Sequence, residues 1–242
     1  MSRTDDSEDF FRYFVPDFID RRKSYSKEND RFVHYTTAEN AINIIRSKKI
    51  WMRNVKCMND FMEIEHGFEI LLKFFDKESN TREKFFKTMD RCWPGAAQSA
   101  IDMFDAWFYH IRNNTFVSCI SEHAAHEDRL GRLSMWRAYG NTNVGAAIVV
   151  KNAPFNITDE IGIISSPILY LDENSLHESI NNCLKLIDEN CEKIKSYPEQ
   201  QFQANIFSQI LMYALCTKHP GFTKKKNGGL YTSLNCGTRK EF

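Results

Sequence analysis

The stretch FVHYTTAENAINIIRSKKIWMRN, residues 32–54, predicts a strand, a helix and a second strand in succession. The apolar run up to His34 is typical of a strand, and Lys48–Arg53 has the pattern of another. Thr36 or Thr37 can cap the helix between them, because a hydroxyl oxygen accepts a hydrogen bond from a backbone N–H group that the first helical turn leaves unpaired. A titratable imidazole at such a junction indicates a functional site.

Helical and strand patterns alternate along the rest of the chain, which predicts an α+β fold with a mixed β-sheet core and a large helical portion. We expect a single domain over residues 31–222, preceded by a helical extension over 1–30 and followed by an irregular tail over 223–242. The nearly all-apolar GAAIVVK, Gly145–Lys151, indicates a central strand of the sheet. Further helices are expected over about Asp60–Phe75, Ala96–Ile111, Leu130–Tyr139, Glu173–Ser196 and Glu199–Cys216, and further strands over Thr115–Ile120 and Ile161–Leu171.

The composition limits what the chain can do. Its 242 residues are 42% hydrophobic, enough for a full core, and its 32 Lys and Arg residues equal its 32 Asp and Glu residues. This balance gives no overall basic field, so net charge does not favour nonspecific binding of nucleic acid. The acidic, polar N-terminus does not resemble a secretory signal, and no apolar run approaches the roughly 18–20 residues of a membrane span.

The cysteines indicate a reducing compartment. Seven of them are scattered along the sequence, and none forms a CxxC pair. Because reducing agents keep thiols free in the cytoplasm, an odd and scattered set is best explained as free thiols in a cytoplasmic protein.

His34 and Tyr35 are the first candidates for a binding site. Neighbours in a strand point to opposite faces, so one of the pair faces a cleft or solvent and the other faces the core. A neutral histidine can bind a ligand hydroxyl group, because one ring nitrogen donates a hydrogen bond and the other accepts one. The alternative is a structural histidine that ties the strand to a loop.

Two other segments carry side chains suited to binding. CISEHAAH places Cys119, His123 and His126 at a spacing that resembles that of zinc ligands, although no second Cys or His pair lies nearby. The alternative there is a polar loop after a strand. LSMWRAYG places Trp136 and Tyr139 on one helix face, where aromatic rings either stack on a planar ligand or belong to the core.

The tail PGFTKKKNGGLYTSLNCGTRKEF, residues 220–242, has neither an amphipathic period nor clear β patterning. Its three consecutive lysines can be encoded by a run of adenines. Removing two adenines from such a run shifts the reading frame, and KKKNGGLY becomes KKEWRFI. We therefore predict that the sequence after about Lys225 is out of frame because the run gained two bases, which leaves the chain with a truncated C-terminus.

The order of several short motifs resembles a bacterial family of domains of unknown function, family 2971. Together these motifs span about Arg31–Phe222. They are HYTT, a strand with Trp51, MNDFME, VSCISE, LSMWRAYG, Gly145 with its strand, Tyr170 and KHPGF. Members of that family typically follow the last motif with an acidic segment ending in Glu-Trp-Arg. This chain departs there, and the alternative frame would restore such an EWR sequence.

The opening unit also resembles the start of ADP-ribosyltransferase folds, especially those of DNA-modifying toxins. This resemblance implies that the chain binds NAD as its substrate through His34, Tyr35 and Thr36. His34 would contact the ribose, and Tyr139 or Trp136 would stack on the nicotinamide. His34 and Tyr139 would then be the catalytic residues. The late Glu that stabilises the developing oxocarbenium ion has no counterpart in the tail, so the resemblance implies impaired activity.

Three functions are open on these observations. The first is an NAD-using ADP-ribosyltransferase or NAD glycohydrolase of bacterial conflict or phage defence, which uses a small-molecule nucleotide and has a protein or nucleic acid as acceptor. The second is a non-enzymatic module that binds a ligand or a protein. The third is a zinc-dependent or nucleic-acid-acting protein that uses Cys119, His123 and His126. We rank them in that order, and expect no resident metal and no membrane association.

Overall fold

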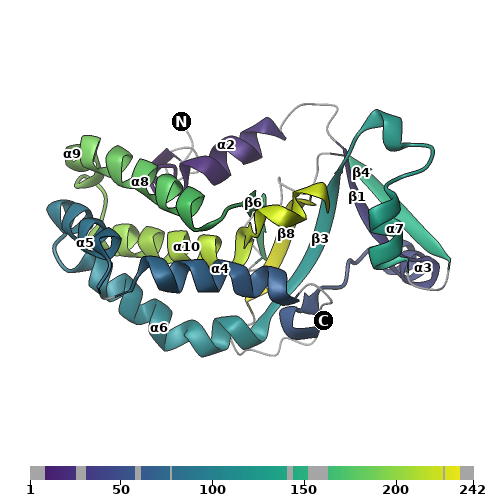
Figure 1. The fold of residues 1–242 in the computed structure, drawn as a ribbon, viewed down its shortest axis with the longest axis horizontal. Coiled ribbons are helices and arrows are strands. Elements are labelled where there is room, and N and C mark those ends of the chain that lie inside the picture. Colours follow the sequence, from purple (N-terminus) through teal and green to yellow (C-terminus); the bar gives the residue numbers. More distant parts are fainter. Residues whose placement is uncertain are drawn as a thin grey trace. The chain divides into compact units, whose positions relative to one another are not determined.

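The computed structural model describes residues 9–25, 31–57, 61–76, 78–140, 144–151, 163–225 and 227–234. These residues have a mixed α+β fold, which confirms the predicted class (Figure 1). The chain forms two compact units, each assembled from three separate segments. The helical unit consists of Met1–Asp20, Asp60–Ile111 and Leu169–Pro220, and the sheet unit consists of Arg21–Asn59, Arg112–Ile168 and Gly221–Phe242.

Helices dominate the helical unit, and α2 and α6 both begin in it. Its elements are α2 (Pro16–Ser24), α4 (Phe61–Phe74), α5 (Asn80–Cys92), α6 (Ala96–Asn114), α8 (Glu173–Glu189), α9 (Cys191–Ile194) and α10 (Glu199–Cys216), with the parallel strands β6 (Leu169–Tyr170) and β7 (Thr217–Lys218). None of the helices in the described part of the chain combines the length and the apolar character needed to cross a bilayer.

Aromatic side chains fill much of the core of the helical unit. The ring of Phe14 packs edge-on against Phe202, and the ring of Phe18 packs in the same way against Tyr213. All four side chains are buried, and such edge-to-face pairs stabilise a core beyond the area that they bury. Helix α2 begins at Pro16, whose fixed φ suits the first turn of a helix. Its lack of an N–H group costs no hydrogen bond there, because N–H groups of the first turn have no partner within the helix.

Gly67 allows α4 and α10 to approach each other closely. A Cβ atom on residue 67 would lie 2.3 Å from the backbone oxygen of Ala214 and 2.9 Å from that of Tyr213. These distances are far below van der Waals separation, so a larger residue requires the helices to move apart. The interior glycine costs about 1 kcal/mol relative to alanine in helix propensity, and the close packing offsets that cost.

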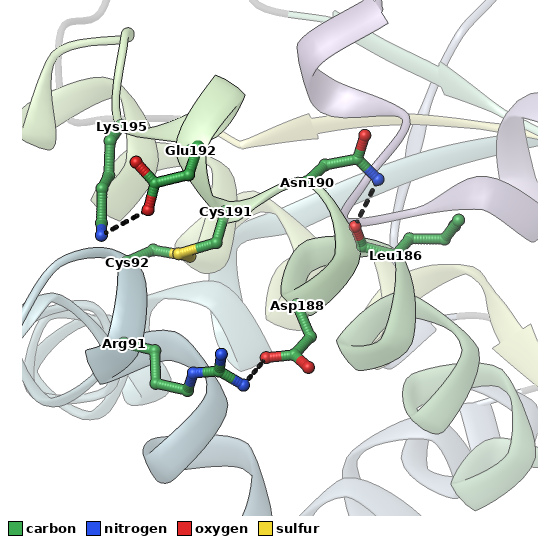
Figure 2. The surroundings of a disulfide bond; sticks show 8 residues. All are labelled: Arg91, Cys92, Leu186, Asp188, Asn190, Cys191, Glu192 and Lys195. Carbon is green, nitrogen blue, oxygen red and sulfur yellow. Dashed lines mark hydrogen bonds and ion pairs between the residues drawn. A yellow bond between two sulfur atoms is a disulfide. The ribbon is translucent and has the colours of Figure 1, made fainter.

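A disulfide bond joins the end of α5 to the start of α9, from Cys92 to Cys191 (Figure 2). Both cysteines are buried, and Arg91 next to them forms an ion pair with Asp188. The expectation that all cysteines are free thiols is therefore wrong for this pair. Their 99-residue separation hid the pairing, because it depends on how α5 and α9 fold together and not on local spacing.

One antiparallel sheet forms the centre of the sheet unit, with strand order β4-β1-β3-β8-β5 and with β2 paired to β3 outside this path. Its strands are β1 (Arg31–Thr37), β2 (Arg53–Asn54), β3 (Thr115–His123), β4 (Gly145–Lys151), β5 (Ile163–Ser166) and β8 (Asn227–Leu234). Helices α3 (Ala38–Ser47) and α7 (Leu133–Tyr139) pack beside β1 (Figure 1). The short 3-10 turns are η1 (Val55–Cys57), η2 (Ala125–Glu127) and η5 (Pro220–Lys225).

The strand, helix and strand predicted for the opening stretch are present as β1, α3 and β2. The hydroxyl oxygen of Thr37 caps α3 by accepting a hydrogen bond of 3.3 Å from the Asn40 N–H group. The second strand is shorter than expected and contains Arg53 and Asn54 alone. Its pairing partner β3 determines this length, since a strand exists only where it has a ladder to join.

The sheet forks after Val33. Up to this residue β1 pairs with β3, with Val33 opposite Ser121. Strand β4 pairs with β1 along its whole length, from Arg31 opposite Lys151 to Thr37 opposite Gly145. Strand β3 pairs with β2 and β8, with Val117 opposite Arg53. Beyond Val33, β1 therefore stays paired with β4 while β1 and β3 separate.

Two expectations about the sheet differ from the structure. We expected Gly145–Lys151 to be central, but β4 is an end strand of the sheet, and its residues alternate between half-buried and exposed. Its small apolar side chains resemble a central strand in sequence. Within residues 223–242, which we expected to be irregular, Asn227–Leu234 form β8 between β3 and β5. Strand β8 forms through backbone pairing with β3 and β5, and its sequence lacks the alternation of apolar and polar residues from which a strand is predicted. Residues 235–242 lie outside the described residues.

Candidate functional site

A pocket of about 700 Å³ opens in the sheet unit at the fork between β1 and β3. Side chains from β1, α3, β3 and α7 line it, together with the segment that leads into β2. Strands β1 and β3 provide two walls. Helix α3, which follows β1 in the chain, and helix α7, which follows β3, provide further lining. The predicted strand–helix–strand unit, with His34 on its first strand, therefore forms part of this pocket.

His34 places its imidazole at the wall of this pocket. The Nδ1 atom lies 3.0 Å from the carbonyl oxygen of Cys119. Because a carbonyl oxygen can only accept, Nδ1 carries the proton and donates a hydrogen bond to that oxygen. The neutral ring then offers Nε2 as an acceptor. Burial lowers the pKa of His34 below its ordinary value, the bond to Cys119 opposes this, and the positive charge of Arg53 adds to the lowering. The imidazole is therefore neutral at pH 7.

Tyr35 lies on the other face of β1, as predicted for neighbours in a strand. It is buried with Met135, and its hydroxyl oxygen accepts a hydrogen bond of 2.9 Å from the Arg132 N–H group. The ring of Trp136 meets the Tyr35 ring edge-on, with ring centroids 4.8 Å apart. Neither aromatic side chain is among the described residues that line the pocket. Tyr35 and Trp136 therefore form the core behind the site.

Gly131 makes room for these two aromatic side chains. Its φ of +63° lies in the left-handed region, which glycine adopts without strain. A Cβ atom at this position would lie 2.8 Å from Nε1 of Trp136 and 2.9 Å from the Tyr35 hydroxyl oxygen. The indole N–H group of Trp136 donates to the carbonyl oxygen of Leu130 at 2.7 Å. The turn before α7 thus fixes that helix against β1.

A mostly buried ion pair also holds this turn. Arg132 binds the carboxylate of Glu127 and donates a hydrogen bond of 2.6 Å to the carbonyl oxygen of Glu122. Burial raises the pKa of Glu127, but hydrogen bonds from Arg132 and from the Ala124 N–H group outweigh it and lower the pKa overall. Glu127 is therefore ionised at neutral pH and keeps Arg132 in place at the start of α7.

The structure brings three of the five predicted binding residues together in the pocket: His34, Thr36 and Tyr139. Thr36 follows His34 by two positions, on the same side of β1. Tyr139 is the last residue of α7, so its place depends on the turn that holds this helix. Of the two residues predicted to stack on nicotinamide, Tyr139 lines the pocket, whereas the half-buried Trp136 packs against Tyr35 and is not among the described lining residues.

Three further pocket residues have chemistry that sequence reasoning missed: Trp51, Arg53 and Arg137. Trp51 and Arg53 lie at the end of the opening stretch, and Arg137 lies between the two aromatic residues of LSMWRAYG. Trp51 is 68% exposed, so its indole ring is accessible at the pocket. A tryptophan two residues before an arginine, at the end of the opening stretch, was the signal that could have identified Trp51 and Arg53.

The three residues with zinc-like spacing do not form a metal site. The described part of the chain contains no group of three or more His, Cys, Asp or Glu residues arranged to hold a metal ion. Cys119 contributes to the pocket wall. The buried His123 is engaged by Asp128, whose carboxylate lies 2.8 Å from its Nε2 atom. His126 lies in η2, so the spacing results from a strand followed by a turn.

Comparison with known families bears on the segment that begins in α7. Residues 135–226 match the family model described as Protein of unknown function (DUF2971). The DUF2971 match confirms the predicted resemblance over these residues. This segment contributes Arg137 and Tyr139 to the pocket, whereas His34 and Thr36 precede it. Comparison with curated proteins and with solved structures gives no match, so the resemblance to ADP-ribosyltransferase folds stays a prediction.

Proposed function

We propose that the pocket binds a nucleotide such as NAD and that the chain is an ADP-ribosyltransferase-like protein. The observation that carries this proposal is the neutral imidazole of His34 at the pocket wall, with Nδ1 bound to the Cys119 carbonyl and Nε2 able to accept a ribose hydroxyl group. Tyr139 supplies an aromatic ring to the same pocket. We place this function in a cytoplasmic bacterial effector of conflict or phage defence, which transfers ADP-ribose to a protein or nucleic acid or hydrolyses NAD.

The reaction needs a carboxylate, and the described lining of this pocket contains none. Breaking the bond between nicotinamide and ribose develops positive charge on the sugar, which a carboxylate stabilises in a dry site. None of the described residues that line the pocket is Asp or Glu. Loss of such a group slows a reaction by about a hundredfold or more. The predicted frame after Lys225 would supply a Glu in its EWR sequence, and we propose that its absence impairs the chain.

Labelled NAD tests this function. The gene is sequenced across the codons for Lys224–Lys226, and two proteins are purified: the present chain and one from which two adenines of that run have been removed. We expect both to bind NAD, and the frame-shifted protein to release nicotinamide at least about a hundredfold faster.

His34→Ala should abolish NAD binding in both proteins, while His126→Ala, outside the pocket, should leave it unchanged. Absence of binding and turnover in both proteins, with His34→Ala behaving as the parent does, would count against the proposal.

The same missing carboxylate favours a second function, a non-enzymatic module that binds a nucleotide or a protein partner. This function predicts that NAD binds to the present chain and stays intact. It also predicts that the frame-shifted protein gains no turnover. The nicotinamide measurement therefore separates the two functions on the same samples.

A further inference from the structure

The pocket carries a strong positive charge for its size. Arg53, from β2, and Arg137, from α7, both line it, and no Asp or Glu does so within the described part of the chain. No carboxylate among the described residues forms an ion pair with either guanidinium group. Two arginines that share a cavity in which no described residue is a counterion favour an anionic ligand.

The arginines come from separate elements. Arg53 lies on β2, which pairs with β3 at Val117, whereas Arg137 lies on α7, which packs against β1. The charge of Arg53 reaches His34, which places that guanidinium near the imidazole. The negative groups of a ligand bound to His34 through a sugar would therefore share the pocket with both arginines.

Two further features of the lining suit the rest of a nucleotide. The indole of Trp51 is exposed at the pocket, and an exposed aromatic ring is the platform on which a planar base stacks. The hydroxyl group of Ser118 is buried in the pocket wall and has no hydrogen-bond partner among the described residues. A buried hydroxyl without a partner costs free energy that a polar ligand atom can recover.

We propose that Arg53 and Arg137 bind the diphosphate of a nucleoside diphosphate or dinucleotide and that Trp51 stacks on its base. Guanidinium groups suit phosphate oxygens because their planar N–H donors bind two oxygens at once. This proposal deepens the proposed function, since it concerns the same pocket. It assigns two specificity-determining arginines and one stacking residue that the sequence resemblance does not include.

Titration with ADP, AMP and adenosine tests the proposal, with binding followed by calorimetry and by tryptophan fluorescence, to which Trp51 contributes as one of four tryptophans. We expect ADP to bind about a hundredfold more tightly than adenosine, and AMP to lie between them. Arg53→Gln and Arg137→Gln should each weaken ADP binding about tenfold and leave adenosine binding unchanged. Trp51→Leu should weaken the binding of all three ligands by a similar factor. Calorimetry measures this change because it does not depend on the fluorescence of the removed indole.

Arg46→Gln is the matched control, because this exposed arginine lies on α3 and does not line the pocket. Arg137→Lys provides a second variant that keeps the charge, and it should retain most of the preference for ADP. Thermal unfolding of each variant confirms that it folds. Equal affinities for ADP and adenosine, or arginine variants that bind ADP as the parent does, would overturn the proposal.

The outcomes also separate this inference from the proposed function. If ADP binds in an arginine-dependent way while NAD is neither bound nor consumed, the diphosphate site stands and the NAD-using function fails. If NAD binds through His34 and the arginine variants bind it equally well, the function stands and the diphosphate site fails.

Discussion

His34 joins β1 to β3 through its side chain, one residue beyond the last backbone pair between the two strands. The carbonyl oxygen of Cys119 lies at the fork, and the Nδ1–H group of His34 donates to it. The same bond fixes which nitrogen of the ring faces a ligand as an acceptor. One side chain therefore stabilises the fork in the sheet and determines the chemistry of the pocket that the fork opens.

The lowered pKa of His34 predicts how folding stability depends on pH. Between its value in the folded state and its ordinary value of about 6.5, the unfolded chain binds a proton more readily than the folded chain does. The stabilisation by the neutral ring is therefore fully present above about pH 6.5 and is lost as the pH falls through this window.

Urea unfolding of the parent and of His34→Gln from pH 8 to pH 5 measures this effect. We expect the difference in free energy of unfolding, parent minus variant, to shrink as the pH falls below about 6.5. A difference that stays constant over this range would contradict a neutral, buried ring.

At the scale of elements, much of the pocket followed from local sequence patterns. Strand alternation predicted that His34 and Tyr35 face opposite ways, and the hydroxyl group of Thr37 predicted the start of α3. The roles of Trp51 and Arg137 did not follow, because side chains from separate elements meet only once β1 and β3 have diverged. The place of β4 at the end of the sheet was also beyond local patterns, since strand order is a property of long-range pairing.

The crossing of α4 and α10 gives a prediction at the same scale. Gly67→Ala would place a methyl group 2.3 Å from the Ala214 carbonyl oxygen, so the helices must separate. We expect the free energy of unfolding to fall by about 2 kcal/mol, because overpacking outweighs the gain in helix propensity. Chemical denaturation followed by circular dichroism measures this change.

Glu69→Ala serves as the control, because its side chain lies on the exposed face of the same helix. It should change stability by no more than about 0.5 kcal/mol. If Gly67→Ala were as stable as this control, close helix packing at residue 67 would not limit the fold.

At the scale of the whole molecule, the disulfide between Cys92 and Cys191 links segments 99 residues apart. Closing so long a loop restricts the unfolded chain, so we expect Cys92→Ser to lower the free energy of unfolding by about 2–5 kcal/mol. Cys57→Ser, at an exposed cysteine outside the disulfide, should have little effect. A parent protein that unfolds identically with and without a strong reductant, and identically to Cys92→Ser, would show that the bond is not formed in solution.

The interleaving of the two units has a practical consequence for anyone who clones part of this gene. The polypeptide passes five times between the helical and the sheet unit, so no single cut yields either one as a continuous piece. An excised segment with the boundaries of the DUF2971 match would carry Tyr139 without β1 and β3, and hence part of the pocket lining without the strands that supply the rest. Failure of such a fragment to bind ligands would reflect a missing half of its architecture, and any screen for activity needs the entire reading frame.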